Sequence, residues 1–103
     1  MPTDLPPSSV LLDAAATWAA SVGSGPEVAL VEEWVWPHGQ SRVARVRTGS
    51  GDVVVKWERS ARNVEREVEA LRRWVPALGD DAGQLLAADV AAHVLVLTHV
   101  APT

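Results

Sequence analysis

The chain has 103 residues, 48% of them hydrophobic and 21% charged, a composition typical of one globular domain and not of a disordered segment. The net charge of −4 argues against broad nucleic-acid binding, and the lack of cysteine excludes disulfides and thiolate metal sites. Because no apolar run reaches the roughly 20 residues of a membrane span and Met1–Asp4 lacks the basic start of a secretory signal, we expect a cytoplasmic protein with neither nucleic-acid nor membrane partners.

The first predicted element is a helix that runs from Ser8 or Ser9 to about Val22. A serine side chain can cap its first turn, and the segment Gly23–Pro26 ends it. Apolar residues at helical spacing predict one buried stripe, made of Val10, Leu11, Ala14, Trp18 and Val22.

Three strands are predicted next, over Glu27–Trp36, Ser41–Thr48 and Val53–Glu58. The turn residues Gly49–Asp52 predict that the second and third strands form an antiparallel hairpin. The alternation of apolar and arginine residues in Ser41–Thr48 slips once, which predicts a β-bulge in that strand.

A second helix is predicted from an N-cap at Ser60 to about Val75, followed by strands over Leu85–Val90 and His93–Val100. Its buried face repeats every three or four residues, at Val64, Val68, Leu71, Val75 and Leu78. The predicted fold class is therefore α+β: a five-stranded antiparallel sheet with one packed helix and an additional N-terminal helix.

Lys56 is the only lysine of the chain and lies in the Val-rich third strand, on the same face as Val54 and Glu58. Of the three glutamates in the following helix, Glu67 borders the buried stripe, so it can lean over the sheet toward Lys56. A half-buried ammonium needs such a partner, and the pair can then present positive charge to phosphate oxygens. The alternative is a structural ion pair at an ordinary strand–helix unit.

This order of elements, with a strand lysine and a glutamate on the next helix, resembles the N-terminal lobe of protein-kinase-like enzymes. The segment Arg66–Trp74 (REVEALRRW) is similar to the R-E-x-x-x-L segment of the aminoglycoside phosphotransferase and choline-kinase-like family. The resemblance covers residues 25–103 and implies a nucleotide-binding lobe there, preceded by an N-terminal segment and helix over residues 1–24.

The resemblance also implies roles for individual residues and a cofactor, ATP with Mg²⁺. Lys56 would hold the α- and β-phosphates and Glu67 would orient it, while Gly39 lies in the segment that corresponds to the phosphate-covering loop. The adenine site would be formed by a roof residue, a gatekeeper and two backbone groups, which correspond to Val54, Leu97, the Thr98 carbonyl and the Val100 amide.

The sequence departs from the family in two respects. The loop around Gly39 has a single glycine, so a plain turn is the alternative there, and no H-x-D segment or metal-site aspartate follows. Because those aspartates orient the acceptor hydroxyl and hold Mg²⁺, this chain alone is not expected to transfer a phosphoryl group. No catalytic residue and no metal site are predicted, and the catalytic lobe is expected to be absent.

Two functions follow as hypotheses. The first is the ATP-binding lobe of a small-molecule, aminoglycoside-type phosphotransferase, whose partner is the missing C-terminal lobe or a second molecule that covers the same surface. The second is a stand-alone α+β interaction or regulatory module in which the pair of Lys56 and Glu67 is only structural and the hydrophobic last strand, His93–Val100, is a dimer or partner interface.

Overall fold

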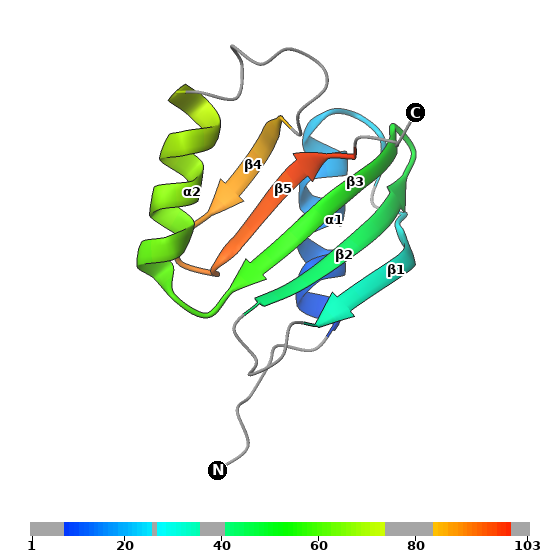
Figure 1. The fold of residues 1–103 in the computed structure, drawn as a ribbon. Helices are drawn as coiled ribbons and strands as arrows, with labels where there is room; N and C mark the ends of the chain where they lie inside the picture. The colour runs from blue at the N-terminus through cyan, green and yellow to red at the C-terminus, as the bar shows by residue number, and fades with distance from the viewer. Residues whose placement is uncertain (1–7, 26, 36–40, 74–83, 100–103) are drawn as a thin grey trace, which may run out of the picture.

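The computed structural model describes residues 8–25, 27–35, 41–73 and 84–99. Within these residues the chain forms two α-helices and five β-strands, which confirms the predicted α+β class (Figure 1). In chain order the elements are α1 (Ser8–Ser21), β1 (Ala29–Val35), β2 (Ser41–Thr48), β3 (Gly51–Glu58), α2 (Ala61–Arg73), β4 (Leu85–Asp89) and β5 (Val94–Thr98).

The five strands form one open antiparallel sheet in the order β1-β2-β3-β5-β4. The first three strands are neighbours in the sequence, but β5 pairs with β3 and leaves β4 at the edge. The apolar β5 is therefore hydrogen-bonded on both sides, and the edges of the sheet are β1 and β4 (Figure 1).

The predicted hairpin of β2 and β3 is confirmed. The two strands pair without interruption from Ser41 opposite Glu58 to Thr48 opposite Gly51. Gly51 has a φ of 109°, a conformation that side chains with a Cβ rarely adopt, so glycine is required where β3 begins.

The predicted bulge in β2 is wrong. The register is irregular between Leu30 and Glu32 of β1, whereas β2 follows β3 without a break. The alternation of β2 slips for another reason: Ala44 and Val46 are buried on one face of the sheet while Val43 lies on the other face, and both faces carry apolar residues.

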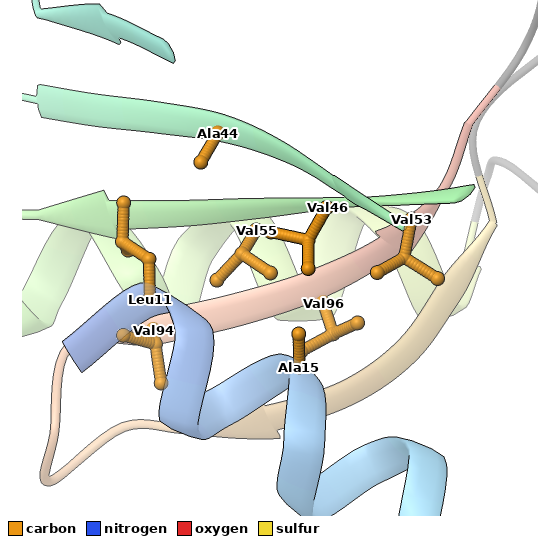
Figure 2. Close-up of a cluster of buried hydrophobic side chains, with 8 residues drawn as sticks. All are labelled: Leu11, Ala15, Ala44, Val46, Val53, Val55, Val94 and Val96. Carbon is orange, nitrogen blue, oxygen red and sulfur yellow. The ribbon is translucent and has the colours of Figure 1, made fainter. Parts of the chain in front are cut away.

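Helix α1 covers one face of the sheet and forms the larger core with it. Leu11 and Ala15 are fully buried and point toward the strands, as Figure 2 shows. The side chains that meet them come from β2, β3 and β5: Ala44, Val46, Val53, Val55, Val94 and Val96.

The buried stripe of α1 differs from the prediction at its end. The stripe runs through Leu11, Ala15 and Ala19, all fully buried, whereas Val22 is 52% exposed. Val22 follows the last helical residue, and its amide donates to the carbonyls of Trp18 and Ala19 in the closing turn. The alanines let the helix approach the sheet closely, so hydrophobicity alone misplaces the stripe.

Helix α2 covers part of the opposite face. Val64 and Val68 are buried against Leu95 of β5, with Leu71 partly buried beside them, as the helical spacing predicts. The predicted N-cap is confirmed, since the Asn63 amide donates to the Ser60 hydroxyl at 3.3 Å. The rest of the predicted stripe, Val75 and Leu78, lies outside the described residues.

No helix among the described residues is long and apolar enough to cross a membrane.

The position of the buried stripe of α1 predicts that two side-chain truncations will differ in their effect on stability. Leu11→Ala should lower the free energy of unfolding by about 2–5 kcal/mol, because it leaves a cavity between helix and sheet. Val22→Ala should change it by less than about 0.5 kcal/mol, because that side chain is exposed. Urea denaturation followed by tryptophan fluorescence measures both, and equal losses would contradict this packing.

Candidate functional site

Lys56 lies on the face of the sheet that α2 covers. Its Nζ is 3.0 Å from Oε1 of Glu67, so the ion pair predicted between β3 and α2 is confirmed. Both side chains are partly buried, with 25% of Lys56 and 28% of Glu67 exposed. A pair at this depth is screened less by solvent than a surface pair.

The helical phase selects Glu67 from the glutamates of α2. Val64 and Val68 face the sheet, and Glu67 lies next to Val68 on the side of the helix nearer to β3. Glu69, in contrast, has 66% of its side chain exposed and pairs with Arg73 at 3.3 Å along the helix surface. That contact is an ordinary solvated i, i+4 pair.

Lys56 has a second anionic partner, Glu58, which the sequence analysis did not assign. Oε1 of Glu58 lies 3.0 Å from Lys56 Nζ, and the other carboxylate oxygen accepts a hydrogen bond from the Ser41 hydroxyl at 2.9 Å. Glu58 and Ser41 are both buried. The spacing in the sequence is consistent with this contact, since residues two apart in a strand share a face.

The backbone of Glu58 is also fixed. Its amide donates to the His93 carbonyl at 3.0 Å, and its own carbonyl accepts from Nδ1 of His93 at 2.9 Å. His93 has a φ of 65° and stacks on Trp57, with ring centroids 6.2 Å apart. Glu58 is therefore held at its backbone by His93 and at its carboxylate by Ser41 and Lys56.

The pKa of Lys56 depends on two opposing effects, burial of the ammonium and its hydrogen bonds to carboxylates. Burial disfavours the ammonium and lowers the pKa, but the hydrogen bonds to Glu67 and then to Glu58 outweigh it, so the pKa is raised above the ordinary value of 10.5. Lys56 is thus fully charged at neutral pH. An ammonium has three N–H donors, and two of them are directed at carboxylates, which leaves one for another ligand.

The strand pairing identifies the neighbours of Lys56 on this face. Lys56 lies opposite Val43 of β2 and Leu95 of β5, and Val54 lies opposite Arg45 of β2 and Leu97 of β5. Val43, Val54 and Leu97 are each partly exposed. The structure thus places Lys56, Glu67, Val54 and Leu97, four of the predicted site residues, on one side of the sheet.

Of the other three predicted site residues, Thr98, Gly39 and Val100, only Thr98 is among the described residues. Thr98 lies at the end of β5, where its amide donates to the Gln84 carbonyl at 2.9 Å and its hydroxyl accepts from the Gln84 amide at 2.8 Å. Gly39 and Val100 lie outside the described residues.

Further ion pairs fix β2 relative to the neighbouring strands. On the face that carries Lys56, Arg45 contacts Asp52 at 2.7 Å and Glu32 at 3.4 Å. On the opposite face, Arg42 binds Glu33 through two nitrogens, at 2.8 and 3.0 Å. The Arg42 hydrogen bond is the main reason why the pKa of Glu33 lies below its usual range.

Comparisons of the chain with protein-family models, with curated proteins and with solved structures gave no match. In the described ranges, no group of three or more His, Cys, Asp or Glu side chains is placed to hold a metal ion. The function must therefore be argued from the residues of the site.

The pKa of Lys56 provides a test of its contacts. Glu67→Gln should lower this pKa, because burial is then opposed mainly by Glu58. An NMR titration of the side-chain carbon resonances measures it without ambiguity, since the chain has one lysine. Glu69→Gln is the matched control on the same helix and should leave the pKa unchanged.

The same shift predicts how stability depends on pH. Because the pKa of Lys56 is higher in the folded state than the ordinary value of 10.5, its contribution to stability is complete below that pH and is lost as the pH rises through the folded-state pKa. Urea denaturation above pH 10 should show a smaller loss for Glu67→Gln than for the unchanged protein. An identical alkaline loss in both proteins would contradict a stabilising role of the pair.

Proposed function

We propose that the chain is a nucleotide-binding lobe of the protein-kinase-like type, in which Lys56 binds phosphate oxygens. The observation that carries this proposal is the 3.0 Å ion pair between Lys56 of β3 and Glu67 of α2. In kinases a lysine on the third strand and a glutamate on the following helix form such a pair and place the ammonium against the nucleotide phosphates.

The order of the elements supports the same proposal. A three-strand meander is followed by the helix that carries the glutamate and then by two more strands, with the last strand next to β3. The apolar side chains of Val54 and Leu97 lie together beside Lys56, which suits a base that rests on the sheet while its phosphates reach the ammonium.

The proposed activity of the complete enzyme is transfer of the ATP γ-phosphoryl group to a hydroxyl of a small polar, aminoglycoside-like acceptor. Lys56 would contact a phosphate oxygen, Glu67 would position Lys56, and the end of β5 would contact adenine. In this family type the aspartates that bind Mg²⁺ and orient the acceptor hydroxyl belong to a second lobe, which the proposal places outside residues 25–103. An H-x-D segment encoded after Thr103 would support this proposal, and a stop codon at that point would favour the interaction module.

Weak binding of ATP·Mg²⁺ is the direct test. In an NMR titration, ATP·Mg²⁺ should shift the amide resonances of Val54 and Leu97 only at millimolar concentrations, since the sheet provides one wall of a cleft. Lys56→Met should remove these shifts, whereas Arg73→Met, at an exposed cation of α2, should preserve them. Thermal melting verifies the fold of each variant, because Lys56→Met leaves two carboxylates without their cation.

Two results would contradict the proposal. Shifts that persist in Lys56→Met would show that the ammonium is not the phosphate ligand. Sub-millimolar binding by this chain would show that the site does not depend on a second lobe.

A second candidate function is a protein-interaction module, and the edge strand β1 favours it. Four of its seven residues are large apolar side chains that are between 37% and 47% exposed: Leu30, Val31, Trp34 and Val35. An edge strand also presents unpaired backbone groups to which another strand can add. The interaction surface would thus be β1, since the apolar β5 is paired on both sides.

This candidate predicts self-association through β1. Sedimentation equilibrium should detect a dimer that Leu30→Lys abolishes, because a charge on the edge strand opposes strand addition. Val22→Lys is the matched control, since Val22 is also an exposed apolar residue but lies at the end of α1. A monomer at all concentrations, or equal effects of both variants, would exclude β1 as the interface.

A further inference from the structure

The second carboxylate at Lys56, that of Glu58, adds a negative charge at the place where an anion would bind. Lys56 Nζ lies 3.0 Å from one oxygen of Glu58 and 3.0 Å from one oxygen of Glu67, so one positive charge is shared between two negative charges. Before any ligand arrives, this group of three side chains carries a net charge of about −1 at neutral pH.

The two carboxylates differ in their freedom to move. Glu58 has 11% of its side chain exposed, and its second oxygen is bound by the buried hydroxyl of Ser41. Glu67 has 28% of its side chain exposed on a helix surface. A phosphate that approaches Lys56 therefore meets the negative charge of Glu58 at a fixed position, and Glu58 cannot withdraw without breaking its bond to Ser41.

We propose that Glu58 is a built-in counter-ion that limits phosphate binding at Lys56. It occupies one of the three ammonium donors and places a fixed negative charge next to the phosphate position. The inference rests on the proposed function, since it assigns to Glu58 the role of setting the affinity of the same site.

Glu58→Gln tests this inference, because glutamine keeps the length and the hydrogen-bonding capacity of the side chain and removes its charge. Inorganic tripolyphosphate is the probe, and isothermal titration calorimetry at low salt measures its affinity for the whole 103-residue chain. Glu58→Gln should bind it about tenfold more tightly than the unchanged protein, the order expected when one charge a few ångströms from the ligand is removed.

Two further variants separate the possible causes. Glu33→Gln is the matched control: it removes an ion-paired carboxylate from the opposite face of the same sheet, where Arg42 holds it, and should leave the affinity within about twofold. Glu58→Asp keeps the charge but is one methylene too short for the contact with Lys56, so it frees the donor. It should tighten binding about two- to threefold, and it provides the test if Glu58→Gln does not fold.

The outcomes distinguish this inference from the proposed function. Tighter binding in Glu58→Gln that disappears in the double variant with Lys56→Met supports the inference. Binding that depends on Lys56 but is unchanged or weaker in Glu58→Gln overturns the inference and leaves the proposed function intact. If neither the unchanged protein nor Glu58→Gln shows binding that depends on Lys56, both are overturned.

Discussion

The ammonium of Lys56 is the constraint on which the arrangement of α2 and the sheet depends. Half-buried on the face that α2 covers, it requires anionic partners, since an uncompensated charge at that depth is costly. One partner comes from its own strand, through Glu58, and the other from the helix, through Glu67. The apolar contact of α2 with the sheet is small, made chiefly by Val64, Val68 and Leu95. The ion pair therefore adds a directional contact between helix and sheet to this apolar packing.

Local periodicity in the sequence predicted the helices and strands well, but it could not predict which strands distant in the sequence would pair. The hairpin of β2 and β3 follows from turn residues between two β-rich segments, and the N-cap at Ser60 follows from its hydroxyl. The placement of β5 between β3 and β4 joins segments about 40 residues apart, so no local signal contains it. The stripe of α1 was misplaced at Val22 because its buried contacts are made by alanines, whose hydrophobicity signal is weak.

In the site, too, local spacing predicted some contacts and missed others. Glu67 was predicted as the partner of Lys56 because helical phase leaves one glutamate at the border of the buried stripe. Glu58 was placed on the correct face but not recognised as a partner, since strand spacing brings side chains to one face without showing which of them meet. The contact between the Ser41 hydroxyl and Glu58 was not predicted either, because it joins side chains of two different strands.

The presence of two carboxylates at one ammonium helps to choose between nucleotide binding and a purely structural ion pair. A purely structural ion pair needs one carboxylate for one ammonium, and the second carboxylate then adds repulsion without a further charge to neutralise. In this chain the extra carboxylate is buried, hydrogen-bonded by Ser41 and fixed through the backbone contacts of His93. Such an arrangement restrains the ammonium of Lys56 between two carboxylates. The second carboxylate opposes anion binding, so the case for nucleotide binding rests on the pair of Lys56 and Glu67 and on the apolar pair of Val54 and Leu97 on the same face. These groups suit a ligand with a flat apolar part and an anionic part, and for this reason we favour nucleotide binding over a purely structural role.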